Sequence, residues 1–141
     1  MNARITLGDW NGQSAHAKPV RYEVFVLEQK VPLDMEWDEM DAVCVHAVAW
    51  DETGRAIGTG RLLPDGHIGR MAVLPAARGS GIGAALLDAL VGAAARRGDR
   101  AVMLNAQTQA EAFYRRYGFE RDGEVFMEAG IPHIHMRRVL T

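Results

Sequence analysis

The chain of 141 residues carries 16 lysine and arginine residues against 18 aspartate and glutamate residues, a formal net charge of −2. This balance gives no general attraction to nucleic acid or to an anionic membrane, so neither is expected as a partner. The length fits one domain over residues 1–141, and the single cysteine, Cys44, excludes a disulfide framework and a multi-cysteine zinc site.

Neither a signal peptide nor a membrane span is expected. The first residues become polar by Gly8 and Asp9, which is too early for the apolar core of a signal peptide. No uninterrupted apolar run approaches the roughly 18 residues that a membrane helix needs. We therefore expect a cytoplasmic protein, with Cys44 as a small core residue between Val43 and Val45.

The N-terminal part predicts a strand over residues 5–7, a turn over 8–12 and a helix between Ser14 and Gln29, with Pro19 in its first turn or at a kink. An acidic loop or short helix follows Pro32. Its acidic residues are Asp34, Glu36, Asp38, Glu39 and Asp41. They attract a cationic amine or form a solvated loop, and the sequence leaves both open.

The central part predicts three strands in an antiparallel meander, because strong turn signals separate its apolar runs. After Pro75 the apolar residues recur at helical spacing, and Gly98 closes that helix. A short strand, a helix containing Phe113 and Tyr114, and two final strands complete the chain. The expected strands cover residues 43–51, 56–63, 67–74, 101–104, 123–128 and 133–139. This order favours an α/β (α+β) fold with a mixed, mostly antiparallel sheet and helices on both faces.

Between the third meander strand and the long helix lies the glycine-rich segment 78–83, Arg-Gly-Ser-Gly-Ile-Gly. The first amides of a helix lack partners and carry about half a positive charge, which makes them a binding site for phosphate. Glycines allow close approach, and Arg78 can add a charge-assisted contact. The segment therefore predicts a diphosphate site, with a ligand-free tight turn as the alternative.

Two other nucleotide sites fit less well. Gly79, Gly81 and Ala84 match the loose dinucleotide pattern G-x-G-x-x-G/A, but the next predicted strand ends at Asn105 and not at an acidic residue. A nicotinamide oxidoreductase is therefore disfavoured. No Lys-Ser or Lys-Thr follows the glycines, which excludes a nucleoside-triphosphate loop.

The glycine segment resembles the signature Arg/Gln-x-x-Gly-x-Gly/Ala of the Gcn5-related N-acetyltransferase (GNAT) family, through Arg78, Gly81 and Gly83. Residues 71–75 resemble the family's fourth strand, and Asn105 resembles the residue that ends its fifth. Further likeness comes from Phe113-Tyr114 with Gly118-Phe119, the family's Phe-Tyr-x-x-x-Gly-Phe. The segments that resemble the bacterial ElaA-like subgroup are 24–29, 58–62 and 128–133.

The resemblance implies an acetyl-CoA-dependent N-acetyltransferase that uses no metal, in which an amine attacks the thioester directly. The backbone near Val73 would bind the thioester carbonyl, and Tyr114 would protonate the departing thiolate. On spacing alone, Tyr114 also fits an apolar packing stripe. The cofactor-binding residues implied are Met71, Ala72, Val73, Arg78, Gly79, Ser80, Gly81, Ile82, Gly83, Asn105 and Tyr114.

A base must accept a proton from the acceptor amine, which is mostly protonated at neutral pH. The candidates are Glu28, Glu36, His46, His133 and His135. His133 is assigned as catalytic, because it stands where the last hairpin could reach the thioester, with a hydrogen-bonded structural histidine as the alternative. The acceptor is a small-molecule or peptide amine, and both a monomer and a homodimer fit the sequence. A non-catalytic acyl-CoA sensor is the alternative.

Overall fold

The computed structural model describes residues 3–140, apart from the side chain of Met35. Its strands are β1 (Arg4–Gly8), β2 (Val45–Trp50), β3 (Ala56–Leu62), β4 (His67–Val73), β5 (Ala101–Gln107), β6 (Glu120–Arg121), β7 (Phe126–Glu128) and β8 (Ile131–Val139). Its α-helices are α1 (Trp10–Arg21), α2 (Leu33–Glu36), α3 (Ile82–Arg97) and α4 (Glu111–Arg116). The π-helix η1 (Tyr22–Glu28) and the 3-10 helices η2 (Glu39–Val43), η3 (Pro75–Ala77) and η4 (Thr108–Ala110) complete the described elements.

One sheet contains all the described strands, in the order β1-β2-β3-β4-β5-β8-β6, with β7 added alongside β8. The pairing of β4 with β5 is parallel and every other described pairing is antiparallel. The predicted mixed, mostly antiparallel sheet is therefore confirmed, as is the central meander β2-β3-β4. In the described chain, β6 is a strand that the sequence did not predict.

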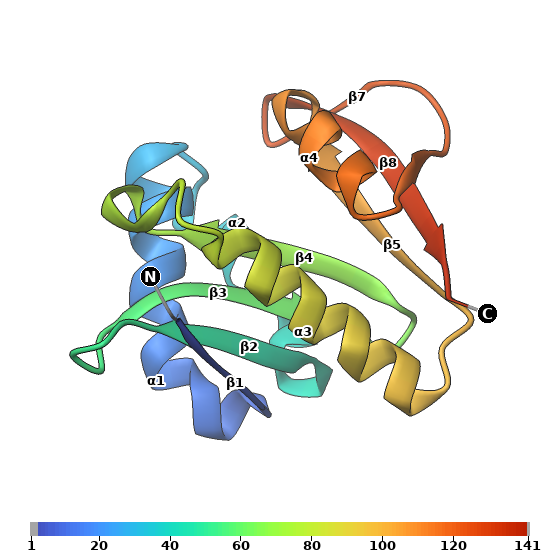
Figure 1. Cartoon of the computed structure of the whole chain (residues 1–141). Coiled ribbons are helices and arrows are strands. Elements are labelled where there is room, and N and C mark those ends of the chain that lie inside the picture. Colours follow the sequence, from blue (N-terminus) through green and yellow to red (C-terminus); the bar gives the residue numbers. More distant parts are fainter. Residues whose placement is uncertain (1–2, 141) are drawn as a thin grey trace.

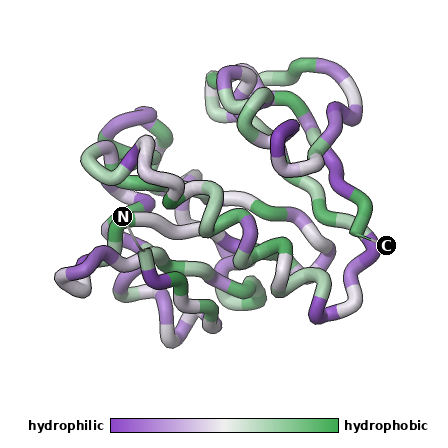
Figure 2. Tube along the Cα trace, in the orientation of Figure 1, coloured by the Kyte–Doolittle hydropathy of each residue, from purple (hydrophilic) through white to green (hydrophobic). Residues whose placement is uncertain are grey.

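Helices α1 and α3 cover opposite faces of β2, β3 and β4 (Figure 1). The predicted apolar stripe of α3 faces the sheet, and its members Ile82, Leu86 and Leu90 are all buried. A Cβ at Gly60 would lie 2.9 Å from Leu90 Cδ1, so this glycine lets the helix approach β3 closely. Figure 2 shows hydrophobic stretches along α3 and the central strands, with hydrophilic residues in many of the loops.

The first helix begins earlier than predicted. Asp9 Oδ1 accepts a hydrogen bond of 2.9 Å from the amide of Gly12, so the segment interpreted as a turn is an N-cap and the first helical turn. Pro19 lies inside α1, so of its two predicted places, the first turn or a kink, the first is wrong. The chain continues directly from α1 into the π-helix η1, which ends at Glu28.

The acidic segment forms a buried ion-pair network. Arg21 Nε donates to Glu36 Oε2 at 2.6 Å, and Arg21 Nη1 donates to Asp41 Oδ1 at 2.8 Å. Arg61 Nη1 donates to both Asp41 and Asp38, at 2.8 and 2.7 Å. Neither sequence interpretation anticipated this role: these three carboxylates are neutralised by arginines and hold α1, α2 and η2 against the sheet.

Strands β4 and β5 pair through only two registered positions, His67 with Met103 and Ile68 with Leu104. Beyond them a bulge interrupts β4, because Arg61 pairs with Gly69 whereas Thr59 pairs with Ala72. The two strands converge at the His67 end and separate toward the other end (Figure 1). The sheet is therefore split into a wedge along its middle.

In the C-terminal part, several strands begin or end at other residues than predicted. Strand β5 continues to Gln107, so Asn105 lies inside this strand and does not end it. The last hairpin has a two-residue turn, Ala129-Gly130, with φ of 51° and 75°, and β8 begins at Ile131. A turn with two positive φ angles matches the twist of its flanking strands.

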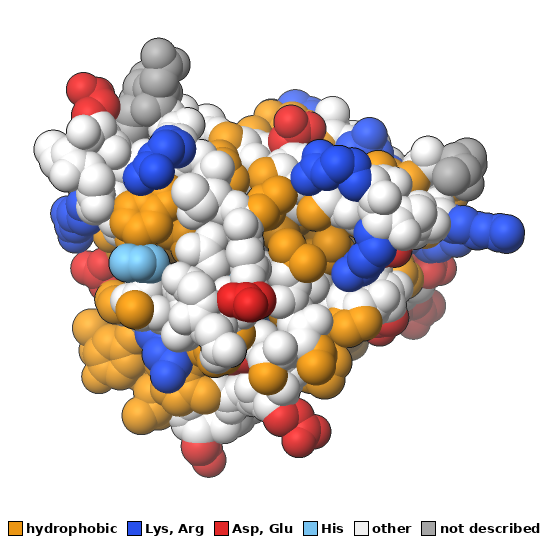
Figure 3. Space-filling model, turned by 90° about the horizontal axis from the view of Figure 1, so that it is seen from below, with side chains coloured by type: hydrophobic (Ala, Val, Ile, Leu, Met, Phe, Trp, Pro, Cys, Tyr) orange, Lys and Arg blue, Asp and Glu red, His pale blue; other side chains and the backbone are white. Residues whose placement is uncertain are grey.

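The molecular surface carries both signs of charge. Figure 3 shows Lys, Arg, Asp and Glu side chains interspersed among hydrophobic ones on the face seen from below. Within residues 3–140, no helix has the length and apolar character required to cross a bilayer.

Candidate active site

A cavity of about 880 Å³ occupies the wedge between β4 and β5. Its walls come from η1, β4, β5, the start of α3, α4 and the β7–β8 hairpin. Of the residues assigned from the sequence, Met71, Ala72, Val73, Arg78, Gly83, Asn105, Tyr114 and His133 line this cavity. The remaining assigned residues, Gly79, Ser80, Gly81 and Ile82, lie in the adjoining loop and first helical position.

The glycine segment leaves the N-terminus of α3 open. Gly81 is the N-cap residue with a φ of 83°, and no side chain caps the helix. Gly79 has the same φ, and at both glycines nothing lies within 4 Å of the position of a Cβ. Uncapped amides on a 16-residue helix, with free space above them, fit a phosphate group.

Arg78 is held by an acidic partner from the opposite wall. Its guanidinium makes a bidentate pair with Glu28, with distances of 2.8 and 2.6 Å. Arg78 Nε also donates to the carbonyl of Val73 at 2.9 Å. Hydrogen bonding from Arg78 lowers the pKa of Glu28. The glycine loop and the end of η1 are therefore tied together across the mouth of the cavity.

The end of β4 directs backbone groups into the cavity. The amide of Leu74 donates to the carbonyl of Ile57 on the β3 side, at 2.9 Å. Because successive residues of a strand direct their backbone groups to opposite edges, the N–H of Val73 points toward the wedge. A donor at this position can bind a carbonyl oxygen on which negative charge grows.

Tyr114 lies at the cavity wall among other aromatic side chains. Its ring centroid is 5.1 Å from that of Phe113 and 6.0 Å from that of Phe119. Burial raises the pKa of Tyr114 to about 12. The phenol therefore stays protonated throughout the physiological range and is available as a proton or hydrogen-bond donor.

Known proteins resemble this chain over most of its length. The model of the acetyltransferase (GNAT) domain matches residues 12–140. The chain belongs to the GNAT family. This GNAT protein is 42% identical over 123 residues to a Bacillus subtilis (strain 168) protein named uncharacterized N-acetyltransferase YjcF, covering 84% of this chain and 87% of that protein.

Solved structures place this GNAT protein in the ElaA-like group. An acyl-CoA N-acyltransferase from Pseudomonas aeruginosa superposes with a TM-score of 0.86 at 37% identity, covering 97% of this chain and 99% of the other. Escherichia coli ElaA gives a TM-score of 0.86 at 28% identity, with the same coverage.

The proposed bases fall in different places in this GNAT structure. His133 and Glu28 line the cavity, although Glu28 is paired with Arg78. Glu36 also lines it, but its side chain is 2% exposed and is bound by Arg21. The other two candidates lie outside the cavity lining: His46 Nε2 is 2.8 Å from the carbonyl of Asp41, and His135 Nδ1 is 2.9 Å from Asn105 Oδ1.

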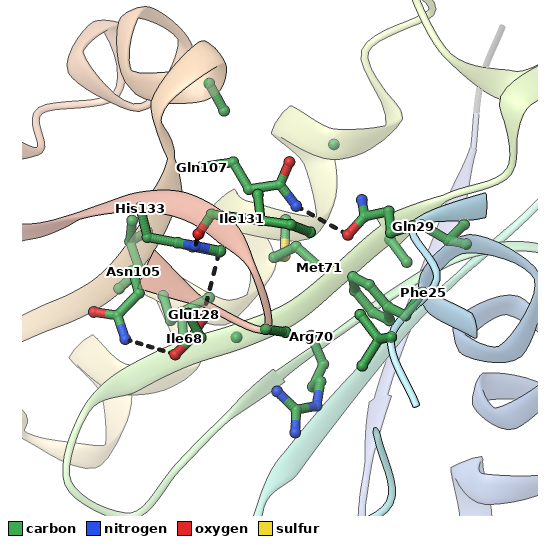
Figure 4. Close-up of a pocket in the computed structure, with 18 of the residues that line it drawn as sticks. Phe25, Gln29, Ile68, Arg70, Met71, Asn105, Gln107, Glu128, Ile131 and His133 are labelled. Atoms are coloured by element: carbon green, nitrogen blue, oxygen red, sulfur yellow. Dashed lines mark hydrogen bonds and ion pairs between the residues drawn. The ribbon is translucent and has the colours of Figure 1, made fainter. Parts of the chain in front are cut away.

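The sequence interpretation gave no site role to several polar residues of the cavity, among them Gln29, Gln107 and Glu128. Gln107 Nε2 donates to Gln29 Oε1 at 3.0 Å and so bridges from β5 to the residue after η1. Glu128 lies close to His133 and Asn105 (Figure 4). The available signals were the likenesses over residues 24–29 and 128–133, which include Gln29 and Glu128, but the contacts of Glu128 depend on the hairpin turn. No group of three His, Cys, Asp or Glu among the described residues is arranged to hold a metal ion.

Proposed function

We propose that this protein transfers an acetyl group from acetyl-CoA directly to a primary amine. The observation that carries the proposal is that the open N-terminus of α3 and Tyr114 adjoin the same cavity. The names of the relatives support it, because one is named an N-acetyltransferase and another an acyl-CoA N-acyltransferase. The GNAT domain and the relatives support acyl-CoA-dependent acetyl transfer, and we add the direct attack by an amine acceptor.

Acetyl-CoA would lie along the wedge from the glycine loop toward β8. The amides of residues 79–83 would bind the diphosphate, with the side chain of Ser80 and the buried Ile82 shaping the loop. The backbone of Met71, Ala72 and Val73 would pair with the pantetheine arm, because this edge of β4 has no partner strand beyond Ile68. Asn105 and Tyr114 would line the end where the thioester lies.

The chemistry requires proton transfers at both the attacking nitrogen and the departing sulfur. The ammonium gives one proton to His133, and the freed lone pair then forms a C–N bond with the carbonyl carbon. As the C–S bond breaks, Tyr114 donates its proton to sulfur, and the second proton of the nitrogen restores the phenol. One proton in total leaves through His133 to solvent.

Two measurements test this proposal. Calorimetry with acetyl-CoA should show binding to the wild type and to Tyr114→Phe, because the phenyl ring preserves the packing with Phe113 and Phe119. A thioester-cleavage assay with a panel of primary amines should show a fall of about 100-fold in kcat for Tyr114→Phe. Binding without turnover of any amine by either protein would instead indicate an acyl-CoA-binding sensor. Failure to bind acetyl-CoA would refute both functions.

We further propose a cytoplasmic location, and both a monomer and a homodimer fit the proposed function. A cytoplasmic location would supply acetyl-CoA, and size-exclusion chromatography with light scattering would distinguish a monomer from a homodimer.

A further inference from the structure

The glutamates that line the cavity differ in how they are neutralised. Glu36 is bound by Arg21 and Glu28 is bound by Arg78, each at 2.6 Å. Among the described residues, the Glu128 carboxylate makes polar contacts only with His133 Nε2 at 3.4 Å and Asn105 Nδ2 at 3.5 Å. Of the three cavity glutamates, Glu128 alone therefore lacks an arginine partner.

The hairpin turn sets the position of Glu128. Glu128 pairs with Ile131 across the two-residue turn, and its side chain is half exposed at the cavity wall. Ala129 adopts a φ of 51°, a left-handed conformation that non-glycine residues rarely adopt. Figure 4 shows Glu128, His133 and Asn105 directed toward one another within the cavity. A tight turn therefore presents a carboxylate that solvent or a small ligand can reach.

A hydrogen bond to the backbone carbonyl of Ile131 fixes the orientation of the His133 ring. His133 Nδ1 is 2.7 Å from the carbonyl oxygen of Ile131, and a carbonyl oxygen only accepts, so Nδ1 carries the hydrogen. In the neutral ring, Nε2 is then a proton acceptor, and it faces Glu128 Oε2. Two atoms 3.4 Å apart can both lie within hydrogen-bonding distance of one amine nitrogen.

We infer that Glu128 binds the ammonium group of the acceptor beside the thioester and holds it against His133 Nε2, so that the acceptors are cationic primary amines. This inference rests on the proposed acetyl transfer and adds the group that recognises the acceptor. The carboxylate attracts the amine in its charged form, which dominates at neutral pH. When the nitrogen passes one proton to His133 Nε2, the resulting imidazolium remains paired with Glu128, so the net charge of the site is unchanged.

The test compares Glu128→Gln with the wild type in the binding of butylamine to the protein saturated with coenzyme A, at neutral pH, by calorimetry. Loss of a charged contact should weaken binding about 10- to 100-fold. Butanol, which has the same chain without the charge, should bind equally to both proteins. Glu124→Gln is the matched control, since Glu124 is an exposed carboxylate four residues earlier that does not line the cavity.

A second readout uses acetyl transfer. With butylamine, Glu128→Gln should mainly raise KM, whereas with butyryl hydrazide, a neutral nucleophile at this pH, kcat/KM should stay within about threefold of wild type. Equal binding of butylamine by wild type and Glu128→Gln, or no binding by either, would overturn the inference. If the wild type does not bind acetyl-CoA, or binds butylamine without acetylating it, the result would instead count against the proposed function.

Discussion

Arg21 and Glu36 form an ion pair of 2.6 Å in which neither side chain is more than 2% exposed. Trp37 covers the guanidinium, with its ring centroid 5.0 Å from Arg21 Cζ. Replacing Glu36 leaves Arg21 to share Asp41 with Arg61, so the buried network keeps one positive charge in excess, which costs about 3–5 kcal/mol. We expect Glu36→Gln to lower the free energy of unfolding by this amount in urea titrations. Glu111→Gln breaks the pair between Glu111 and the half-exposed Arg121 and should cost less than about 1 kcal/mol. Equal losses in the two variants would contradict the structural role of the buried pair.

Asp38 should make stability depend on pH in acid. Hydrogen bonding from Arg61 lowers the pKa of Asp38 from 3.8 to about 2. A depressed folded-state pKa means that its contribution is present above pH 3.8 and is lost as the pH falls toward 2. Allowing for partial exposure, the loss is about 1–2 kcal/mol.

Urea midpoints at pH 5 and pH 2.5 check this, with Asp38→Asn as the reference. The variant should lose less stability than the wild type over this range. Burial raises the pKa of Glu36 and works in the opposite direction, so the comparison with the variant is decisive. Parallel curves for the two proteins would rule out Asp38 as the source.

Gly81 and Gly54 provide a matched pair for the cofactor loop. Both have a φ of 83°, and a Cβ at either position would meet nothing within 4 Å. Alanine at each should therefore cost a similar backbone strain of about 1–2 kcal/mol. Only Gly81→Ala places a methyl group over the open amides of α3, so only this variant should weaken acetyl-CoA binding, by about tenfold or more in calorimetry. Equal affinities in the two variants would place the diphosphate elsewhere.

Glu28 competes for the guanidinium that would contact a phosphate. Glu28→Gln removes the charged partner of Arg78 while keeping the length of the side chain. We expect coenzyme A to bind about two- to tenfold more tightly, because Arg78 no longer has to leave a carboxylate before it meets the diphosphate. Glu111→Gln should leave the affinity unchanged. Weaker binding in Glu28→Gln would mean that the pair holds the loop in its binding conformation.

Cys44 should be chemically inert in the folded protein. Its side chain is buried, and burial raises the pKa of the thiol to about 11, so almost no thiolate forms near neutral pH. A disulfide reagent such as DTNB should react only after urea unfolds the chain, at a rate set by opening. Rapid stoichiometric labelling of the native protein would show that the residue is accessible.

The sequence predicted features that depend on local periodicity. The stripe containing Ile82, Leu86 and Leu90 is buried on α3, and the strong turn signals separate the strands of the meander. Features that depend on distant residues were missed. Asp9 was assigned to a turn because its capping role depends on the helix that follows, and the acidic segment reveals its arginine partners only after α1 and β3 pack together.

The same distinction applies to the candidate site. The glycine loop was predicted from a contiguous segment, because a strand followed by a helix fixes its geometry locally. Glu128 was missed because its contact with His133 depends on a two-residue turn with a non-glycine residue at positive φ. The pair between Arg78 and Glu28 joins residues 50 positions apart, and no local pattern indicates such a contact.

The short pairing between β4 and β5 also determines how fast the backbone amides of β4 exchange without a ligand. With only His67 and Ile68 registered against β5, the amide of Val73 faces the wedge and not a partner strand. Such an amide should exchange its hydrogen with deuterated water quickly, while neighbouring amides bonded to β3 stay protected. A molecule that pairs with this edge would complete the sheet and slow the exchange, so protection of the Val73 amide would report occupancy without any catalytic turnover.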